Sequence, residues 1–467
     1  MEKVPVLEDN KMRTKPLGRL LFGMALPLAL SMLVQALYNI VDSFYVAQIS
    51  TEAVVSLGLA FPIQNLQIGF ATGIAVGMNS LLSKSLGEGN RDRANRAAGN
   101  GIFLMLIAAV LFMLFGFFGA RAFYAMQTDD LVVIEGGAAY TSICCMWTLG
   151  IFVEVMGERM LQASGRTVYT LFTQGTGAVL NILLDPLFIS GYAPLGIPPM
   201  GIAGAAVATV IGQWVAAIMA VIFNLTRNPD VQFKVKYLRP NGDIIRKILS
   251  VGVPSVLMMG IGSVMNFGMN QVLLGIEALG KLGSAVFGLY FKLQSFVFMP
   301  VFGLNNACIS IVAYNYGARQ PKRITGTIKR ALLTALVIML LGMAAFLLIP
   351  EALMGLFASE NQADPQALVE MGAVALRTIC LHFPLAAVGI ALGSSFQALG
   401  VGTYSTITSL CRQLIVLLPA AWLLSLSGDV NKVWLAFPIA EVVSLAVTLL
   451  LYHRIYKNKI KPLYTEQ

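Results

Sequence analysis

Charged residues are scarce in this sequence, and that scarcity excludes a soluble protein. Of the 467 residues only 12% are charged, 57% are hydrophobic, and the mean hydropathy is +0.76. A soluble chain of this length would form two or three domains with much more charge on their surfaces. The apolar runs instead reach about 20 residues or more, enough to cross a hydrocarbon core of about 30 Å. The composition therefore predicts an integral membrane protein.

Cysteine is also rare, and its spacing fits neither a metal site nor a disulfide framework. All five cysteines lie within apolar runs, and we interpret them as small core residues: Cys144, Cys145, Cys308, Cys380 and Cys411. The nucleotide-binding pattern G-x-x-x-x-G-K-[ST] is missing, and no nucleophile stands with a base, so we expect neither ATP hydrolysis nor any other enzyme activity. No cleavable signal peptide is visible, because the first apolar run follows a polar segment of about sixteen residues.

Twelve apolar runs, separated by polar segments, predict twelve membrane-spanning helices. Their expected ranges are 17–49, 53–83, 97–123, 132–156, 167–190, 201–224, 247–275, 282–314, 325–349, 366–395, 403–427 and 432–453. The predicted fold class is therefore an all-α integral membrane protein.

The distribution of positive charge predicts how the chain crosses the membrane. Lysine and arginine are concentrated in the two tails and in the loops after even-numbered helices, whereas the opposite loops hold only Arg121, Lys281 and Lys432. By the positive-inside rule both termini are then cytoplasmic. The net charge of +9 is a consequence of this topology, and we expect a lipid bilayer and no nucleic acid as the partner.

The sequence contains an internal repeat of six helices. The segment LGEGNRDRANRA (86–97) corresponds to YGARQPKRITGT (316–327), FPIQ (61–64) to FKLQ (291–294), and LQASG (161–165) to FQALG (396–400). Pro27 and Asn39 of the first helix likewise match Pro254 and Asn266 of the seventh. Because six is even, both copies enter the membrane in the same sense, which predicts parallel repeats about an axis along the membrane normal. We divide the chain into lobes 1–230 and 247–467, joined by a cytoplasmic linker, 231–246, and expect a central cavity between the lobes.

Several motifs distinguish this chain from other twelve-helix proteins. The loop after the second helix only superficially resembles the G-x-x-x-D-R-x-G-R-R pattern of the major facilitator group, because Gly87 stands one residue too far from Asp92. The chain instead resembles the multidrug and toxic compound extrusion (MATE) family in its P-x(11)-N-x-x-D pattern (Pro27, Asn39, Asp42) and in LQASGR, NILLDPLFI and GIAGAAVATVIGQ. It looks most similar to the bacterial branch whose acidic residues lie in the N-terminal half.

That resemblance implies a function. The expected protein is a secondary active antiporter of the bacterial inner membrane, which exports organic, typically lipophilic cationic, compounds in exchange for H⁺ or Na⁺ by alternating access. No other cofactor is implied, and we expect the protein to work as a monomer. Two alternatives remain open: a lipid-linked oligosaccharide flippase of the same superfamily, and a channel or receptor without coupled transport. An acidic N-terminal lobe argues against the flippase, which usually needs a cationic cavity.

Two carboxylates in the N-terminal half are the strongest candidates for the site of the coupling ion. A charge in the middle of a bilayer costs about 2.5–3.5 kcal/mol on insertion scales, so intramembrane acids are rare and usually functional. Asp42 follows Asn39 by three residues, and Asp185 follows Asn181 by four, which places each pair on one helix face. With the hydroxyl of Thr209 these side chains form a set of hard oxygen ligands that suits a proton or Na⁺. The family's ion site includes residues that match Asp42, Asn181, Asp185 and Thr209; the alternative is that these polar groups only satisfy one another.

The C-terminal half carries mainly basic charges within its predicted spans. They are Lys292, Arg377 and Arg412, with the single acid Glu441 and with His382 nearby. Our simpler interpretation pairs Glu441 with Arg412 or Lys292, and the alternative makes Lys292 or Arg412 a gate residue. We expect His382 to be a packed residue, and Glu154 and Glu158 to form an interfacial pair near the cytoplasmic end of the fourth helix.

Residues that contact the transported compound are suggested by residue type and by position along the helices. The 22 methionines, together with the aromatic residues, can line a cavity for lipophilic cations, but most of them will face lipid or core. We select Tyr38, Gln35 and Gln64 because they lie on the helices that present Asp42.

Overall fold

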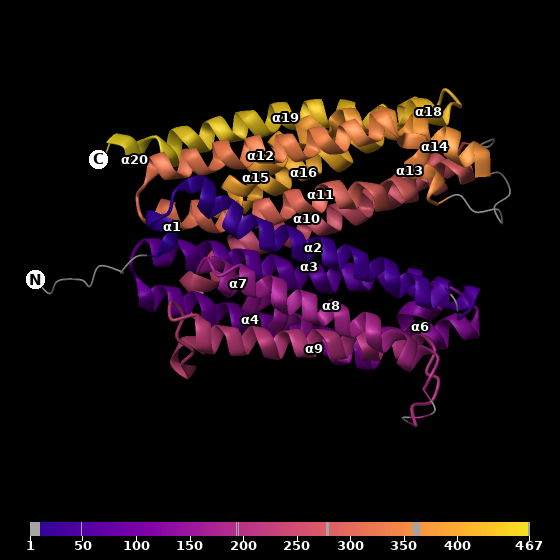
Figure 1. The fold of residues 1–467 in the computed structure, drawn as a ribbon, viewed down its shortest axis with the longest axis horizontal. Coiled ribbons are helices and arrows are strands. Elements are labelled where there is room, and N and C mark those ends of the chain that lie inside the picture. Colours follow the sequence, from indigo (N-terminus) through magenta and orange to yellow (C-terminus); the bar gives the residue numbers. More distant parts are fainter. Residues whose placement is uncertain are drawn as a thin grey trace, which may run out of the picture.

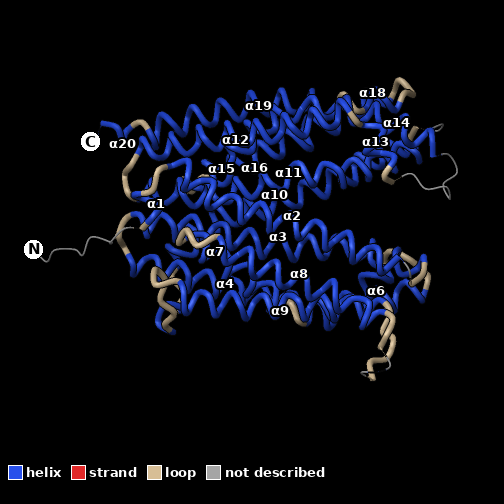
Figure 2. The backbone as a smooth tube through the Cα atoms, viewed as in Figure 1, coloured by secondary structure: helices blue, strands red, loops and turns tan. Residues whose placement is uncertain are grey.

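The computed structural model describes residues 10–47, 49–192, 194, 196–276, 280–357 and 365–465. Almost all of this part of the chain is helical, and loops lie mainly at the two ends of the helices (Figure 2). An isolated bridge between Tyr192 and Ile197 is the extended pairing found there. The all-helical fold class is thus confirmed.

Two sets of long helices form the molecule. The N-terminal half contains α2 (Leu17–Ala47), α3 (Thr51–Gly87), α4 (Arg91–Phe118), α5 (Ala120–Ala125), α6 (Leu131–Met146), α7 (Leu149–Ala163), α8 (Val168–Ile189) and α9 (Ile202–Arg227). The C-terminal half contains α10 (Gly242–Leu274), α11 (Gly280–Gly317), α12 (Pro321–Leu348), α13 (Pro350–Gly355), α14 (Pro365–Ile379), α15 (Phe383–Ala398), α16 (Gly402–Leu410), α17 (Leu418–Ser425), α18 (Val430–Val433) and α19 (Ala436–Ile455). In Figure 1 the two halves are stacked, with α2 and α3 of one facing α10 and α11 of the other.

The predicted spans agree with these helices, with some breaks that the apolar runs did not show. Among the described residues ten helices are long and apolar enough to cross a membrane, and α6 and α7, bent by 46°, form an eleventh span. The twelfth is α8, whose 22 residues suffice for a crossing although its threonine, glutamine, asparagine and aspartate lower its hydropathy. The tenth span is interrupted by the 3₁₀ turn η3 (Cys380–His382), and the eleventh predicted span by the π-helix η4 (Cys411–Leu417).

The two described ends of the chain lie at the same end of the bundle (Figure 1). We call this the terminal end, where α3 and α11 finish at Gly87 and Gly317, and the opposite end the distal end. The predicted linker 231–246 runs along the terminal end. Its 3₁₀ turn η2 (Val235–Leu238) is held by Asn100 of α4, whose amide nitrogen donates to Tyr237 O (3.3 Å), and α10 begins earlier than predicted, at Gly242.

Segments that match in the repeat have the same backbone geometry. After α3 the amide of Asn90 donates to Ser85 O (3.0 Å), and after α11 the amide of Gln320 donates to Asn315 O (2.9 Å). Gly89 and Arg319 take the same left-handed conformation in these turns, with φ of 73° and 53°. The second motif repeats likewise, since Gly165 and Gly400 have φ of 78° and 73°. At these turns the two halves therefore share the backbone conformation as well as the sequence.

The halves pack most closely at the terminal end, through glycines at matched positions. A Cβ on Gly87 would collide with Tyr314 O, and a Cβ on Gly317 would collide with Lys84 O. Further along the same two helices, a Cβ on Gly73 would lie 2.8 Å from Gly252 O of α10, and one on Gly303 would lie 2.5 Å from Ala29 N of α2. Real Cβ atoms do not approach backbone this closely, so the contact requires glycine. We call this glycine-lined contact between the halves the terminal seam.

The same two helices meet open space near the distal end. Gly58 and Gly288 are exposed, and a Cβ on either would have nothing within 4 Å. Each lies 29 residues from its partner in the terminal seam, Gly87 or Gly317, which is about eight helical turns and so returns to nearly the same face. The face of α3 and α11 that is in contact at the terminal end is therefore free at the distal end. Figure 1 shows the two halves diverging toward that end.

A short N-terminal segment closes the terminal seam. Helix α1 (Lys11–Thr14) buries Met12 completely, and the carbonyl of Met12 accepts hydrogen bonds from Arg323 (2.9 Å) and Asn315 (3.3 Å) of the C-terminal half. A Cβ on Gly165 of the N-terminal half would lie 3.5 Å from Met12 Cγ. Burial, and after it the charges of Lys15 and Arg166, lowers the pKa of Lys11 in this segment. Residues 11–15 therefore bridge the two halves.

Candidate functional site

A buried polar cluster joins α8 to α9 in the N-terminal half. Asp185 is fully buried, and Asn181 one turn earlier is 2% exposed. The side-chain amide of Asn181 lies 3.3 Å from Asp185 Oδ1 and 3.2 Å from Thr209 Oγ1. All hydrogen-bonding groups are best satisfied when the amide nitrogen donates to the carboxylate and the amide oxygen accepts from the Thr209 hydroxyl and backbone N–H. The structure thus brings together three of the five residues selected from the sequence.

Close packing of two helices places these groups within reach of one another. A Cβ on Gly212 of α9 would lie 2.7 Å from Gly177 O of α8, so the two backbones approach closely at this point. Asn181 is one turn beyond Gly177, and Thr209 is one turn before Gly212 on the antiparallel neighbour. The glycine pair therefore determines the distance between Asn181 and Thr209.

The carboxylate lies close to the distal end of its helix. Asp185 precedes the last residue of α8, Ile189, by about 6 Å along the axis. Pro186 lies inside the helix and removes the N–H that would otherwise bond to Ile182 O. A backbone oxygen without its helical partner next to a carboxylate is a further oxygen that can contact a cation.

The other acid of the predicted pair is carried by a neighbouring helix. Asp42 and Asn39 belong to α2, which packs along α8. Their side chains lie outside the described residues, so their roles stay predictions. Asp42 is five residues from the end of α2 at Ala47, about 7.5 Å along the axis, and is thus close to the distal end, as is Asp185.

The cluster has the chemistry of a site for a small hard cation. A carboxylate, an amide oxygen and a hydroxyl converge in a region that excludes water, and hard oxygen ligands of this kind suit Na⁺. A carboxylate can also hold a proton in place of a cation. No group of three or more His, Cys, Asp or Glu side chains that could hold a metal ion occurs among the described residues.

The three residues selected for contact with the transported compound have different surroundings. Gln64 turns into its own half, where its side-chain nitrogen donates to the buried Tyr140 hydroxyl (2.7 Å). Gln35 and Tyr38 are half-buried on α2. Gln64 is thus held by a neighbour within its own half.

The charged side chains of the C-terminal half differ in their exposure and in their ion-pair partners. Arg412 on η4 lies 3.7 Å from Glu441 of α19, whose side chain is 4% exposed. Arg377 forms an exposed ion pair with Glu351 of the short helix α13 (2.7 Å). Lys292 of α11 is exposed and forms no ion pair with any described residue. Of the two partners proposed for Glu441, the structure thus selects Arg412.

His382 and Glu158 are two further polar residues that the structure buries. His382 is 5% exposed, and its ring lies 5.1 Å from Phe383 and 6.0 Å from Phe437, as expected for a packed residue. Glu158 is 3% exposed, and its carboxylate accepts hydrogen bonds from Thr173 (2.5 Å) and Gln174 (2.9 Å) of α8. It is therefore buried within the N-terminal half, where α8 packs over it near the terminal end of α7, and its place at the membrane interface stays a prediction.

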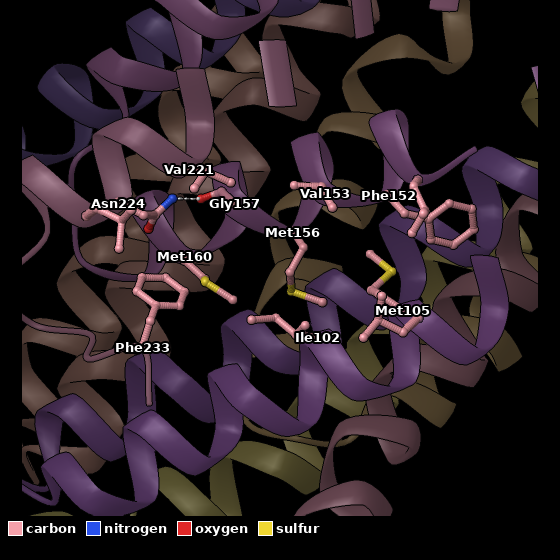
Figure 3. Close-up of a pocket in the computed structure, with 13 residues that line it drawn as sticks. Ile102, Met105, Phe152, Val153, Met156, Gly157, Met160, Val221, Asn224 and Phe233 are labelled. Carbon is pink, nitrogen blue, oxygen red and sulfur yellow. Dashed lines mark hydrogen bonds between the residues drawn. The ribbon is translucent and has the colours of Figure 1, made fainter. Parts of the chain in front are cut away.

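Figure 3 shows an apolar pocket of about 320 Å³ that includes three methionines in its lining, Met105, Met156 and Met160. It is enclosed by α4, α7 and α9, and Asn224 at its edge donates to Gly157 O (2.8 Å). Its rim residues Leu106 and Leu225 are 44% and 64% exposed. The nearest lining residue on α9, Val221, is about 18 Å along the helix from Thr209. This pocket is therefore separate from the polar cluster.

The chain is similar in sequence to one described protein family and to several known transport proteins. The family description MatE matches residues 27–187 and 254–423. The chain is 27% identical to a protein named FAD transporter from Shewanella oneidensis, over 91% of this chain and 92% of the relative. It is 24% identical to the multidrug export protein MepA of Staphylococcus aureus, over 94% of each chain.

Solved structures share the fold. A MATE protein in complex with MaL6 superimposes with a TM-score of 0.90, over 98% of this chain and 100% of that chain, at 24% identity. A multidrug resistance MATE family transporter of the MOP superfamily, in an outward-facing conformation, has a TM-score of 0.89 over 98% and 99% of the two chains, also at 24% identity.

Proposed function

Because the chain belongs to the MatE family of membrane transporters, which are not enzymes, we propose that it is a secondary active antiporter that exports small organic compounds in exchange for H⁺ or Na⁺. The observation that supports this proposal most directly is the fully buried Asp185 with Asn181 and Thr209 as partners. A carboxylate buried in a membrane protein is costly, and binding a proton or a cation offsets part of that cost.

The proposed coupling links the occupancy of this cluster to the packing of the two halves. The cluster is built from α8 and α9, and α8 packs against α2, which in turn packs against α11 of the other half. Binding a cation or proton neutralises Asp185 and changes which arrangement of α2 and α8 is favoured. A ligand shifts such an equilibrium only by its differential affinity for the two states.

The driving energy is sufficient without ATP. Moving one elementary charge through 100 mV is worth about 2.3 kcal/mol. One inward ion can thereby sustain a gradient of about fiftyfold in an exported neutral compound, since 1.4 kcal/mol corresponds to a factor of about ten.

The direction of transport follows from the proposed topology. If both termini are cytoplasmic, the terminal seam is closed toward the cytoplasm and the two halves diverge toward the outside. The structure would then correspond to the state that releases the exported compound and takes up the ion. The cluster around Asp185 lies at the distal end, where an ion from outside arrives first.

The charge of the exported compound is not determined by the relatives. The sequence-based prediction is an organic cation, and multidrug export proteins such as MepA are among the relatives. Another relative is named an FAD transporter, and FAD carries a negatively charged pyrophosphate. The proposed antiporter therefore rests on the polar cluster around Asp185 and on the two-lobe fold.

The proposal is tested in proteoliposomes with imposed pH or Na⁺ gradients and a panel of fluorescent organic compounds. We expect gradient-driven transport in the wild type, and its loss in Asp185→Asn and Asp42→Asn. Asp92→Asn is the matched control, because Asp92 forms an exposed ion pair with Arg96 at the terminal end. Wild-type flux that does not depend on the pH gradient or on the Na⁺ gradient would support a channel and overturn the antiporter proposal.

A further inference from the structure

The apolar pocket of Figure 3 is elongated along the helices that enclose it. Its lining extends along α7 from Leu149 to Met160, about 17 Å along the helix axis. Its volume of about 320 Å³ falls within the range of pockets that hold small molecules, roughly 300–1,000 Å³. The pocket is therefore large enough for a ligand, and its long direction follows helices that cross the membrane.

The lining offers little to a polar or charged ligand. Among the lining residues Asn224 has a polar side chain, and its amide nitrogen already donates to Gly157 O and to Ala220 O (2.8 Å each). Its amide oxygen accepts from Asn228 (3.0 Å). Glu158 of α7 turns away from the pocket, because its carboxylate accepts hydrogen bonds from α8. Burying a polar group here would leave it without a partner, so the pocket favours a hydrocarbon chain.

The pocket opens toward the lipid. Its rim residues Leu106 and Leu225 are exposed, and they belong to α4 and α9, which are both long and apolar enough to span a membrane. Figure 1 shows α9 at the outer edge of the N-terminal half, away from the C-terminal half. Exposed apolar side chains of a membrane span lie against acyl chains. A hydrocarbon chain can thus enter this pocket from the bilayer without crossing water.

Basic side chains lie beside the terminal end of the pocket. Phe233 lines that end, and Lys234 follows it in the sequence. Arg227 is the last residue of α9, two positions beyond the lining residue Leu225. Both cations are exposed. Basic groups placed next to an apolar opening between membrane spans are the arrangement that binds the phosphate of an anionic lipid.

Helix α4 fixes the basic segment next to the pocket. The backbone N–H of Gln232 donates to the side chain of Asn95 (2.8 Å), and the side chain of Asn100 donates to Tyr237 O (3.3 Å). Both asparagines are buried on α4. Lys236, a further exposed cation, lies between these two anchors. The positive charge therefore has a defined position relative to the pocket.

We propose that the pocket binds one acyl chain of an anionic phospholipid, whose phosphate lies beside Arg227 and Lys234. The chain fills the space between α4, α7 and α9, and the two basic side chains donate charge-assisted hydrogen bonds to the phosphate at the membrane surface. Through Phe233 the bound lipid also contacts the segment that joins the two halves. This site is separate from the polar cluster around Asp185 and does not depend on the proposed export function.

The test measures lipid binding to the purified full-length protein in detergent after its native lipid has been removed. Dioleoyl phosphatidylglycerol or dioleoyl phosphatidylcholine is titrated, and native mass spectrometry follows the first lipid bound. We expect the wild type to prefer phosphatidylglycerol. Each basic residue near an anionic lipid contributes about fivefold to binding, so Arg227→Gln/Lys234→Gln should weaken phosphatidylglycerol about 25-fold and leave phosphatidylcholine unchanged.

A matched control removes the same two kinds of charge from the C-terminal half. Lys329 and Arg330 are exposed on α12, and Lys329→Gln/Arg330→Gln should keep the wild-type affinities for both lipids. Equal affinities of the wild type for the two lipids would overturn the proposal. So would an equal loss of phosphatidylglycerol binding in the two double variants.

A second variant tests the pocket itself. Val153→Trp places a large ring in the cavity and should weaken both lipids about tenfold, because an occupied site tolerates little extra volume. Val337→Trp, at an exposed position on α12, should leave both affinities unchanged. Glycerol phosphate, which has the headgroup charge without acyl chains, should not compete with the lipid. Competition by glycerol phosphate, or unchanged lipid binding in Val153→Trp, would place the ligand outside the pocket and overturn the proposal.

Discussion

A substitution at Thr209 weakens the polar cluster around Asp185 without altering a carboxylate. Thr209→Val keeps the shape of the side chain and removes the hydroxyl that lies 3.2 Å from the Asn181 amide. We expect the concentration of driving ion that gives half-maximal transport to rise about tenfold, the effect of losing one hydrogen bond in a charged site. Transport rates in proteoliposomes at graded pH or Na⁺ provide the measurement.

The control for this change lies on the same helix. Thr226 of α9 donates to Ile222 O (2.7 Å) at an exposed position near the terminal end. Thr226→Val should leave the ion dependence unchanged. Equal effects of the two substitutions would mean that Thr209 acts only through the stability of α9.

Glu441 offers a second prediction at the level of single residues. Replacing it with glutamine leaves Arg412 without its opposite charge in a largely buried position. We expect Glu441→Gln to lower the free energy of unfolding by about 1–3 kcal/mol. The double variant Arg412→Gln/Glu441→Gln should recover part of that loss in a thermal melt.

The exposed ion pair of the same half is the comparison. Arg377 and Glu351 are about half exposed, and surface pairs contribute about 0–1 kcal/mol. Glu351→Gln should therefore shift the melting temperature less than Glu441→Gln. A larger shift would show that α13 depends on this pair more than its exposure indicates.

At the scale of helices, replacing the matched glycines of α3 and α11 with alanine should have opposite effects at the two ends of these helices. Gly87→Ala and Gly317→Ala each place a methyl group against the backbone of the other half. We expect each to destabilise the closed terminal seam by about 1–3 kcal/mol, the usual cost of overpacking. Spin-label distances across the terminal end should lengthen in both variants.

The distal glycines provide the contrast within the same helices. Gly58→Ala and Gly288→Ala meet open space, and alanine is favoured over glycine in a helix by about 1 kcal/mol. These variants should be as stable as the wild type or more so, with unchanged spin-label distances. Destabilisation at the distal positions would contradict the divergence of the two halves.

Helix positions were predictable from the sequence because the thickness of the bilayer sets their length. The breaks were not, since they depend on neighbours: at the bend between α6 and α7, Gln67 of α3 donates to the Thr148 hydroxyl and to Cys144 O. The spacing of Asn181 and Asp185 predicted their contact, because four residues make about one turn. The contact with Thr209 required the glycine-mediated approach of α8 and α9, which spacing along one helix does not reveal.

The direction of a polar side chain was the least predictable property. Gln64, selected for contact with the transported compound, donates to Tyr140, and Glu158, expected in an interfacial pair, is covered by α8. Both depend on how neighbouring helices are rotated.

At the scale of the whole molecule, transport requires the terminal seam to open. Asn79 of α3 and Ser310 of α11 are fully buried there and exchange hydrogen bonds of 3.2 Å. In a background without Cys144, Cys145, Cys308, Cys380 and Cys411, cysteines at positions 79 and 310 should be joined by a short bifunctional thiol reagent with a reducible linkage. We expect the cross-link to abolish export and a reductant to restore it.

A cross-link within one half is the control for this experiment. Ser83 and Asn79 lie one turn apart on α3, and linking cysteines at these positions does not tie the halves together. Export should continue in that variant after treatment. Continued export with the two halves linked at 79 and 310 would show that the seam stays closed during transport.

The segment around Met12 also carries a consequence for biosynthesis. The carbonyl of Met12 is held by Asn315 and Arg323, which follow it by 303 and 311 residues. At about 5–20 residues per second, a ribosome needs about 15–60 s to reach these partners after it has made Met12. Throughout that interval residues 11–15, which are synthesised first, have no partner in the C-terminal half to bind. A nascent chain that stops before Asn315 therefore cannot complete the terminal seam, and quality control in the membrane can distinguish it from the finished protein by that open end.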